Sequence, residues 1–288
     1  MPELPDLVHI LKALGPRIEG RRILRATVKN PIVLRVLVPG SFQELVAGRA
    51  IAGLERHGPF LRFGFVAEEG RAGLDLVMHL MLSGRLKLSA AGEKPLAALA
   101  FSLELEGGGS LHYGDEKSMG KVYLCEAGRF EAIPGYLQQG VDVVSEAFTF
   151  EAFSALIDRK RCQARVFVMD QAALSAIGNA YADEILFEAR IHPKTPCYSL
   201  GPEKKREFYE AVRSVLAWGI EEVEKAGLPL EDKARFHMRV RGRAGQSCPR
   251  CGRTIRKAGV LGYDSFFCPA CQPDLTGRGL DWNKLPRG

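Results

Sequence analysis

The sequence predicts an α+β protein of several domains, and three observations carry this prediction. Short β-like runs, separated by Gly, Pro and charged turns, fill the chain from about Ile23 to Cys125. Beyond this region the apolar residues recur with a helical period. Two Cys-x-x-Cys pairs follow near the C-terminal end. We therefore expect an N-terminal helix with an antiparallel β domain, then a helical domain, then a small metal-binding module.

Length and composition agree with a folded protein of one large domain or two ordinary ones. The chain has 288 residues, of which 46% are hydrophobic and 26% charged, as in most globular proteins. No apolar run reaches the roughly 20 residues needed to cross a bilayer, and the start lacks the pattern of a secretory signal. We expect a cytoplasmic protein, in which seven cysteines favour metal ligands or free thiols over disulfides.

The first five residues, MPELP, carry the first candidate chemistry. If Met1 is removed, the nitrogen of Pro2 becomes a free secondary amine, and such groups titrate at roughly 7.7–8.0. A neutral amine of this kind attacks an electrophilic carbon and forms an iminium, and Glu3 beside it can carry a proton. The structural alternative is that a Pro-Glu pair merely starts a helix.

A helix is predicted directly after these residues. Its apolar face has the spacing i, i+3, i+4 and i+7, formed by Leu4, Leu7, Val8, Leu11 and Leu14. The pair Gly15-Pro16 is expected to end it. A helix that begins at residue 3 would hold the terminal amine in one place, as a nucleophile requires.

The middle of the chain predicts strands, then a linker, then helices. The expected strands form an antiparallel sandwich or barrel and are Ile23–Val28, Phe60–Phe65, Leu74–Leu80, Ala100–Leu105 and Val122–Cys125. Residues 128–140 contain Pro134-Gly135 and predict a linker. The expected helices are Phe150–Ile157, Ala164–Leu174, Tyr181–Ala189 and Pro202–Ala226. We therefore divide the chain into a β domain (1–130), a linker (131–145), a helical domain (146–232) and a C-terminal segment (233–288).

A turn between the second and third of these helices is a candidate anion site. Gly178 permits a tight turn, and Asn179 is predicted to cap the helix that follows. Free backbone N–H groups at a helix start favour an anion such as phosphate. The alternative is an ordinary Gly-Asn turn.

The two cysteine pairs predict a structural zinc site. Cys248 and Cys251 are separated from Cys268 and Cys271 by sixteen residues, the arrangement of a tetrathiolate zinc ribbon. Four protein ligands leave no open position, so one structural zinc ion is expected. The other cysteines lack partners at metal spacing and are expected to be buried thiols; they are Cys125, Cys162 and Cys197.

Positive charge is concentrated beside the ribbon. The formal net charge is only +6, yet Lys233–Lys257 holds nine Lys and Arg residues and no acidic residue. Such a block predicts a polyanionic partner, and its alternative is a solvated basic loop.

Together these motifs resemble the formamidopyrimidine-DNA glycosylase / endonuclease VIII family over nearly the whole chain. The matching stretches are MPELP at 1–5, HLMLSGRL at 79–86, MDQ at 169–171, IGNAYADEILF at 177–187, IHP at 191–193, RGR at 241–243, and the four-cysteine ribbon with Gln272. The resemblance implies a two-layered antiparallel β-sandwich behind an N-terminal helix, a helix-two-turn-helix domain and a zinc finger. DNA would lie in the cleft between the domains.

The implied activity is base excision from double-stranded DNA, with the damaged nucleotide turned out of the stack. Pro2 would attack C1′ of the sugar, Glu3 would protonate the ring oxygen, and β/δ-elimination would cut the strand at the abasic site. Asn179, in its turn with Gly178, would hold a backbone phosphate, and Arg243 would lead into the DNA-contacting finger. The resemblance implies a bacterial-type monomer that associates with the nucleoid and not with membranes.

The sequence departs from the family at several DNA-contacting positions. Pro59 stands where the family has a phosphate-binding lysine, and Tyr263 stands in the register of a finger arginine. Leu82, Lys117 and Met119 match the methionine, arginine and phenylalanine that fill the void left by the flipped base. Excision of 8-oxoguanine is therefore the least secure implication, unless a cation elsewhere compensates, such as Arg35, Arg62 or Arg256.

Three function classes remain open from the sequence. The leading hypothesis is a DNA glycosylase with abasic-site lyase activity and an altered lesion range, and it predicts a borohydride-trapped adduct with abasic-site DNA. The second is a non-catalytic or weakly catalytic binder of damaged DNA, which predicts binding without strand scission. A tautomerase-like enzyme would also use an N-terminal proline but gives no reason for a zinc ribbon beside nine cations. RNA binding through the ribbon is a further possibility.

Overall fold

The computed structural model describes residues 1–67 and 72–274 and divides into two compact units. The first unit consists of Met1–Gly140 and Trp218–Arg235, and the second of Val141–Ala217 and Phe236–Gly288. Each unit is therefore assembled from two separate stretches of the chain, and each is described by itself below.

The first unit begins with α1 (Leu4–Ile18), which buries its apolar face against the β region. Of the predicted apolar face, Leu4, Leu7 and Leu14 are buried, whereas Val8 and Leu11 are only half-buried. Ile10, which the prediction left out, is buried as well. The prediction that Gly15-Pro16 ends the helix was wrong, because α1 continues to Ile18. A proline in the last turn removes one hydrogen bond of a helix that is already ending, and the Glu19 amide still bonds to the Gly15 carbonyl at 3.0 Å.

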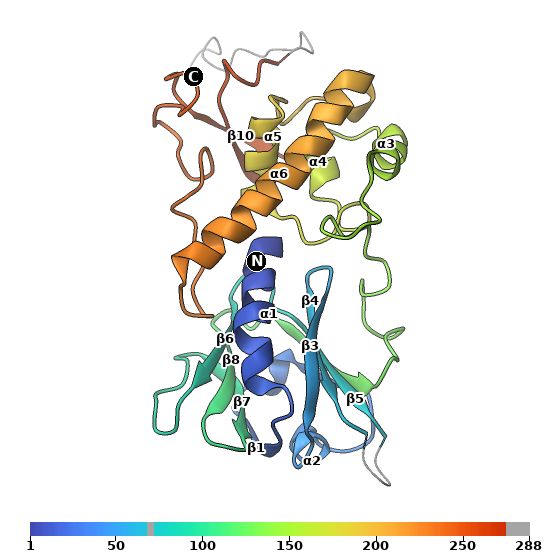
Figure 1. Ribbon diagram of the computed structural model, residues 1–288, viewed down its shortest axis with the longest axis vertical. Helices are drawn as coiled ribbons and strands as arrows, with labels where there is room; N and C mark the ends of the chain where they lie inside the picture. Colours follow the sequence, from blue (N-terminus) through green and yellow to red (C-terminus); the bar gives the residue numbers. More distant parts are fainter. Residues whose placement is uncertain (68–71, 275–288) are drawn as a thin grey trace, which may run out of the picture. The chain divides into compact units, whose positions relative to one another are not determined.

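Two sheets form the layers of the β-sandwich in this unit (Figure 1). One sheet has the order β1-β7-β8-β6, with β1 (Ile23–Val28), β7 (Leu99–Leu105), β8 (Ser110–Asp115) and β6 (Gly84–Ser89). The other has the order β2-β9-β5-β4-β3, with β2 (Leu34–Val36), β9 (Lys121–Glu126), β5 (Leu74–His79), β4 (Phe60–Phe65) and β3 (Ile51–His57). Short helices η1 (Pro31–Val33) and α2 (Phe42–Val46) lie between the early strands.

The predicted strands are confirmed, and the sheets add details that periodicity missed. Two of the predicted strands, β1 and β4, have the expected bounds, and four further strands, β2, β3, β6 and β8, complete the sheets. All pairs are antiparallel except β2 with β9, which run parallel. As predicted, residues 128–140 contain no helix or strand. Ile133 and Tyr136 from this segment nevertheless pack on Phe60 in a buried cluster, so the segment belongs to the core of the first unit.

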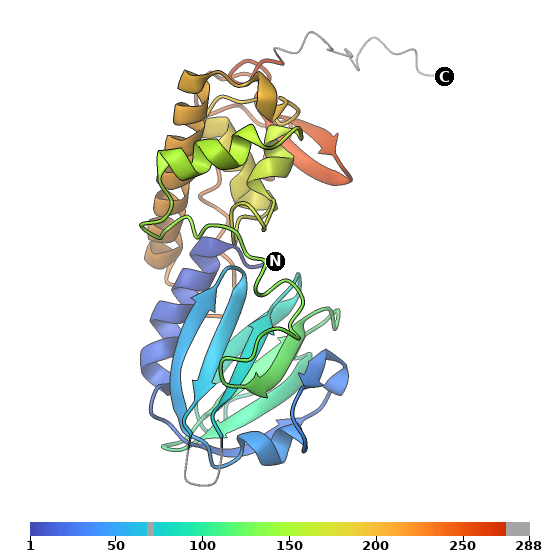
Figure 2. The same cartoon turned by 90° about the vertical axis from the view of Figure 1, so that its right-hand side faces the viewer.

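The second unit carries the helices and the C-terminal hairpin (Figure 2). Its elements are α3 (Phe150–Asp158), α4 (Ala164–Val168), α5 (Asn179–Glu188), η2 (Cys197–Ser199), most of α6 (Pro202–Ala226), β10 (Arg256–Val260) and β11 (Tyr263–Phe267). The prediction that α4 extends to Leu174 was wrong, because the helix ends at Val168. Side chains stop it: Asp170 accepts from the Ala172 amide at 3.0 Å, and Gln171 accepts from the Ala176 amide at 2.8 Å. No helix in the described ranges combines the length and the apolar character needed to span a membrane.

Candidate functional site

The first, N-terminal turn of α1 is held in place by the buried carboxylate of Asp6. Asp6 Oδ2 accepts from the Glu3 amide at 2.8 Å, and the Asp6 side chain also accepts two bonds from Arg235, at 2.9 and 2.6 Å. Asp6 is only 5% exposed, so this charge-assisted fork forms out of bulk water and is stronger than a surface pair. Pro2 and Glu3 are buried as well. The first turn, with the two residues predicted to carry the chemistry, therefore has one fixed position in the first unit.

Pro2 borders a small hollow of the first unit. The hollow has room for about one water molecule. Its lining joins the terminal turn to the β5–β6 turn and to the segment after α6, through Pro2, Asp6, His9, Ile10, Leu80, Gly84, Arg85, Leu86, Val223, Leu230, Asp232 and Lys233. Three stretches far apart in the sequence thus meet around the candidate nucleophile.

The terminal amine lies in surroundings that favour its neutral form. This chain begins with Met1, and burial lowers the pKa of the Met1 amine from 8.0 to about 6. The positive charge of Lys233 lowers this pKa further, as does that of Arg235, while Glu3 and Asp6 oppose the shift. An amine at this position is therefore largely unprotonated near neutral pH.

His79 supports the β5–β6 turn in its neutral form. Burial and then the charge of Lys121 lower the pKa of His79 to about 4. Its Nδ1 accepts from the Met81 amide at 3.1 Å, and its ring packs edge-on against Phe60 at 5.0 Å. The turn also contains Leu82, the first of the predicted void-filling residues, which is 48% exposed.

A buried carboxylate joins the Leu82 turn to the turn that carries Lys117 and Met119. Asp115 accepts from the hydroxyl of Ser83, from the Lys117 amide at 3.3 Å and from the Gly120 amide at 2.6 Å. The Lys117 amide also donates to Ser83 Oγ at 3.2 Å. The structure thus brings the backbones of the two predicted void-filling turns together.

Both turns contain strained backbone. Met81 has a φ of 49° and Ser118 a φ of 50°, a left-handed conformation that costs a non-glycine residue energy and often marks a functional turn. Gly120 is required by close approach, because a Cβ there would lie 1.7 Å from the Tyr113 hydroxyl. Leu82 and Met119 stay 48% and 39% exposed at the tips of these turns, where apolar side chains are available to a partner.

Pro59, which stands where the resemblance implies a lysine, puts no cation in the β3–β4 turn. It is buried beside Gly58, which has a φ of 54°. Of the suggested substitutes, Arg62 is engaged with Glu55 at 2.5 Å and with Asp75 at 3.3 Å. Arg35 donates to the Val33 carbonyl at 3.0 Å and lies over the Tyr123 ring, and Arg256 lies on β10 in the second unit. The cations that act on the terminal amine are instead Lys233 and Arg235, which the sequence alone did not single out.

In the second unit, Asn179 is oriented by a buried arginine. Asn179 is the first residue of α5, and Gly178, in extended conformation, is the N-cap. The prediction that Asn179 caps the helix was therefore wrong. Its Oδ1 instead accepts from Arg165 at 2.7 Å. An amide whose oxygen is engaged in this way presents its NH2 group as a donor, which suits an anion at the start of α5.

Arg165 belongs to an ion network that sequence reasoning missed. It is 1% exposed, bonds to Asp183 at 3.2 Å and donates to the Asp264 carbonyl at 3.0 Å. Asp183 also accepts from Arg241 and from the Ser265 hydroxyl, each at 2.8 Å. Burial raises the pKa of Asp183, and the two arginines oppose this rise. The network ties α4 and α5 to β11; its one sequence signal was a lone arginine within the apolar stretch of α4.

The neighbouring Glu184 holds the backbone segment that leads into the zinc finger. Its carboxylate accepts from three successive backbone amides, those of Arg239, Val240 and Arg241, at 3.0, 2.9 and 2.9 Å. Burial raises the pKa of Glu184, while these three bonds lower it. Arg243 follows this segment and donates to the Phe236 carbonyl at 3.1 Å.

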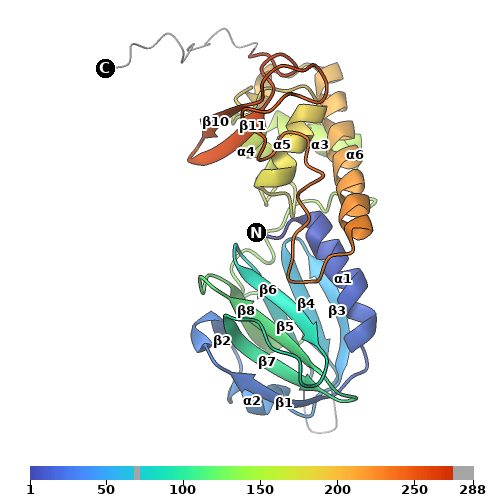
Figure 3. The ribbon, with the colours of Figure 1, turned by 90° about the vertical axis from the view of Figure 1, so that its left-hand side faces the viewer.

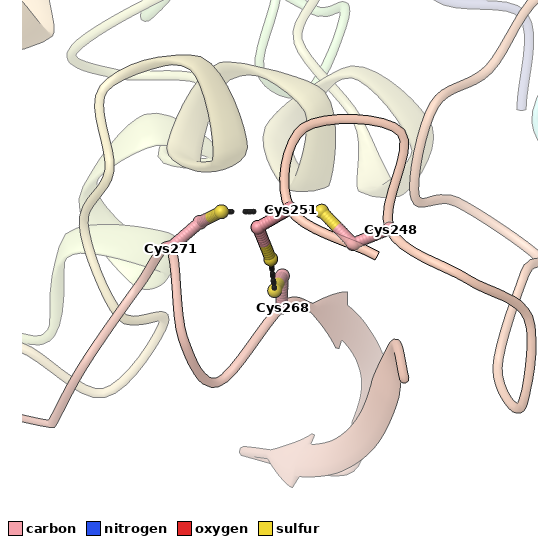
Figure 4. Close-up of side chains that lie close together, drawn as sticks. All are labelled: Cys248, Cys251, Cys268 and Cys271. Carbon is pink, nitrogen blue, oxygen red and sulfur yellow. Dashed lines mark hydrogen bonds between the residues drawn. The ribbon is translucent and has the colours of Figure 1, made fainter. Parts of the chain in front are cut away.

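The four cysteines gather as the spacing predicts (Figure 4). Their sulfur atoms all lie within 4.8 Å of one another, with Cys248–Cys271 at 3.9 Å and Cys251–Cys268 at 3.5 Å. Zinc–sulfur bonds of about 2.3 Å in a tetrahedron require sulfur separations of about 3.8 Å, so the donor set fits zinc. Beneath it Phe187, Val240 and Ile255 form a buried cluster, and Phe266 packs against this cluster.

The finger hairpin is formed by β10 and β11 (Figure 3), and the residues at its tip are exposed. Leu261 has a φ of 47° and is 74% exposed, and Tyr263 at the start of β11 is 54% exposed. Tyr263 thus presents a phenol to solvent at the hairpin tip, where a single O–H group can donate.

Ion pairs neutralise more of the positive charge in the basic block, Lys233–Lys257, than the sequence suggests. Five of its nine cations form ion pairs with acidic residues from elsewhere in the chain: Arg235 with Asp6, Arg239 and Arg250 with Glu188, Arg241 with Asp183, and Lys257 with Asp264. Within the described residues, four have no ion pair: Lys233, Arg243, Arg253 and Arg256. Most of these cations therefore stabilise the fold, and a smaller number remain available to bind a polyanion.

Comparisons with known proteins agree with this arrangement. Three family models match in order: the formamidopyrimidine-DNA glycosylase N-terminal domain over residues 1–122, the H2TH domain of the same enzymes over 139–229, and the zinc finger found in FPG and IleRS over 245–273. This chain belongs to the formamidopyrimidine-DNA glycosylase family. The recognition drawn from the motifs is confirmed, and so are the fold class and the one structural zinc, which the finger holds through its four cysteines.

Relatives of this glycosylase family match most of the chain. The formamidopyrimidine-DNA glycosylase of Moorella thermoacetica is 35% identical over 89% of this chain and 94% of its own length. That of Thermus thermophilus is 34% identical over 94% of this chain and 98% of its own length. The crystal structure of the MutM (Fpg) protein from Thermus thermophilus has a TM-score of 0.80 at 32% identity, covering 94% of this chain and 98% of that one. A Lactococcus lactis Fpg mutant in complex with a Fapy-dG-containing DNA has a TM-score of 0.82 at 25% identity.

Proposed function

We propose that this DNA glycosylase is bifunctional: it removes a damaged base through a Schiff base on Pro2 and cleaves the strand as an abasic-site lyase. The observation that carries the proposal is the terminal turn. Pro2 and Glu3 are buried above a carboxylate that Arg235 holds in a two-pronged ion pair. The amine at this terminus has its pKa lowered to about 6, and removal of Met1 would expose the nitrogen of Pro2 to the same surroundings.

In the proposed reaction the Pro2 nitrogen attacks C1′ of the damaged nucleotide, and Glu3 gives a proton to the ring oxygen. The base leaves and the sugar opens into an iminium. Loss of a C2′ proton then expels the 3′ phosphate by β-elimination, and a second, δ-elimination expels the 5′ phosphate. Because the nitrogen must be neutral to attack, surroundings that lower the pKa of the Met1 amine support activity at neutral pH once Pro2 has become the terminus.

The DNA is proposed to be held by groups of the second unit. The amide of Asn179, oriented by Arg165, would donate to a backbone phosphate at the start of α5. Gly178, the N-cap of α5, would share in this turn, and the finger with Arg243 and Tyr263 would add contacts. Leu82, Lys117 and Met119, on their joined turns, would fill the space left by the flipped nucleotide. The likeness to a relative solved with Fapy-dG-containing DNA supports this partner.

The lesion range is proposed to differ from one centred on 8-oxoguanine. Pro59 is buried and offers no charge, and Tyr263 offers one neutral donor in place of a guanidinium fork. Each lost charge-assisted contact weakens binding by about 1–3 kcal/mol. The same two positions favour the second candidate, a weakly catalytic or non-catalytic binder of damaged DNA.

One experiment separates these candidates. Full-length protein, with the loss of Met1 checked by mass spectrometry, is incubated with abasic-site duplex and sodium borohydride. The proposal expects a covalent adduct, and a Pro2→Gly variant that binds the duplex with unchanged affinity but loses most of the adduct. Duplexes carrying oxidised purines, oxidised pyrimidines or ring-opened bases then define the lesion range. Binding without any adduct, from protein lacking Met1, would leave only the non-catalytic candidate.

A further inference from the structure

The hollow beside Pro2 contains a second amine, that of Lys233. Lys233 lines the same hollow as Pro2 and Asp6, and its charge is the strongest that acts on the terminal amine. Its Nζ donates to the Leu82 carbonyl at 3.4 Å. This amine therefore lies at the turn that we propose to enter the space of the flipped nucleotide.

The neighbouring ion pair leaves Lys233 without a carboxylate partner. Both oxygens of Asp6 accept from Arg235, at 2.9 and 2.6 Å. Arg85 adds a second positive charge beside Lys233. Among the residues that the structure describes, Lys233 has no ion pair. Negative charge near Lys233 therefore balances only part of the positive charge there.

This environment distinguishes Lys233 from other lysines of the chain. A hydrogen bond to Glu93 raises the pKa of Lys87, and one to Asp170 raises that of Lys160. Burial, followed by the charge of Arg85, lowers the pKa of Lys233 from 10.5 to about 8. At pH 7 the neutral amine is therefore far more abundant than in an ordinary lysine. Desolvation and a neighbouring cation are the conditions that activate Schiff-base lysines.

We propose that Lys233 is a second nucleophile of this site, able to form an imine with the C1′ aldehyde of an abasic sugar. The inference rests on the proposed function, because it assumes that abasic-site DNA reaches the hollow. It adds a lyase route that does not need the N-terminal proline. It also assigns chemistry to the segment after α6, which belongs to the first unit although it follows most of the second in sequence.

The proposed step needs no oxidant or reductant. The lone pair of Nζ adds to the C1′ aldehyde of the ring-opened sugar, and the resulting carbinolamine loses water to give a protonated imine. A base removes a proton from C2′, and the C3′–O bond breaks with its electron pair leaving on the 3′ phosphate. Water then hydrolyses the unsaturated imine and regenerates the lysine. Borohydride enters only in the test, where its hydride converts the imine to a stable amine.

The test separates the two amines by moving one of them. Full-length zinc-loaded protein is prepared with its own terminus and with a short Gly-Ser extension ahead of Met1, which carries the terminal amine away from Pro2. Each form is trapped with borohydride on a duplex that contains one abasic site. The adducts are then digested and mapped by mass spectrometry. We expect the extended form to retain an adduct, mapped to the peptide that contains Lys233.

Matched variants make the result specific. In the extended form, Lys233→Arg keeps the positive charge but cannot form the imine, so trapping should fall at least about tenfold. Lys225→Arg changes an exposed lysine on α6 that pairs with Glu222 and should leave trapping unchanged. Melting temperature and zinc content of both variants exclude a folding defect as the cause.

A pH series provides a readout that a structural role would not move. Trapping by the extended form should rise with a midpoint near pH 8, because the neutral amine reacts and the pKa of Lys233 is about 8. An ordinary lysine would titrate near 10.5. The groups that set this midpoint are Arg85, Asp6, Arg235 and Glu3, with His9 and Asp232 also lining the hollow.

The outcomes distinguish this inference from the proposed function. Adduct on the N-terminal peptide alone would overturn the role of Lys233 and leave that of Pro2 intact. Adduct on Lys233 in both forms, with none at the terminus, would support Lys233 and overturn Pro2. Equal trapping by extended Lys233→Arg and Lys225→Arg would overturn the inference, and so would adducts scattered over exposed lysines.

Discussion

The two candidate regions of this glycosylase treat buried charge in opposite ways. In the second unit, Asp183 is matched by Arg165 and Arg241, and every partner has a fixed bond. In the first unit, Asp6 forms a two-pronged ion pair with Arg235, and burial together with neighbouring positive charges lowers the pKa of Lys233 and that of the terminal amine. Complete pairing gives a rigid support, whereas incomplete compensation of positive charge favours the neutral form of an amine. We infer that support and reactivity were assigned to separate regions, and the following changes test that contrast.

The largest effect is expected from the metal. Cys251→Ser removes one of four ligands, and structural zinc contributes about 10–16 kcal/mol to folding in zinc-finger peptides. We expect loss of zinc, loss of the β10–β11 hairpin and at least about a hundredfold weaker DNA binding. Zinc content by atomic absorption and binding by fluorescence anisotropy check this. Cys162→Ser, at a half-buried thiol outside the cluster, is the control and should keep one zinc; unaltered DNA affinity without zinc would show that the support does not depend on the metal.

The next largest effect is expected at the centre of the support. Arg165→Met leaves the buried carboxylate of Asp183 with one arginine fewer and releases Asn179. Removing one partner of a buried ion pair costs about 3–5 kcal/mol. Urea unfolding should report this loss, and phosphate-dependent DNA binding should weaken with it. Arg161→Met, at an exposed position just before α4, should change stability by less than about 0.5 kcal/mol. Equal stability of the two variants would show that the buried ion pairs of the second unit do not act as a rigid support.

In the first unit, stability should depend on pH through His79. Its pKa is lowered to about 4 in the folded protein from an ordinary 6.5. As the pH falls from 6.5 towards 4, the unfolded chain therefore binds a proton that the folded one refuses, and stability decreases. His79→Asn keeps an acceptor for the Met81 amide but does not titrate. Its melting temperature should fall less than that of the wild type between pH 6.5 and 4.5, and parallel curves would contradict the neutral state of His79.

The smallest effect is expected at the hairpin tip. Tyr263→Arg restores a guanidinium at an exposed position and should add one phosphate contact. Affinity for abasic-site duplex should increase by about 1 kcal/mol, and the slope of log affinity against log salt should steepen by about 1. Tyr263→Phe serves as the uncharged control. A gain in affinity with no change in the salt slope would mean that the new side chain does not reach phosphate.

Local pattern predicted the elements, and long-range pairing decided the site. The bounds of β1, β4 and α6 followed from periodicity, and the zinc ligands from spacing alone, because both are properties of short stretches. Pro16 inside α1 and the early end of α4 escaped prediction because neighbouring side chains and the last helical turn override propensity. Arg235 and Lys233 could not be assigned to the terminal turn, since 229 residues separate Arg235 from Asp6. Asn179 was expected to act through its helix end, and only the position of Arg165 revealed its orientation.

The divided first unit has a consequence for synthesis. The helix α1 leaves the ribosome before the other elements, yet Lys12, Asp6 and the hollow find their partners only at Glu224, Arg235 and Lys233. A nascent chain that has reached Gly140 would carry a buried acid without its guanidinium, and it would lack one wall of the hollow. The N-terminal turn, although made first, is therefore completed late, when the finger is still to be translated. The order of synthesis thus delays the final contacts of the N-terminal turn until residues 141–217 of the second unit have been made.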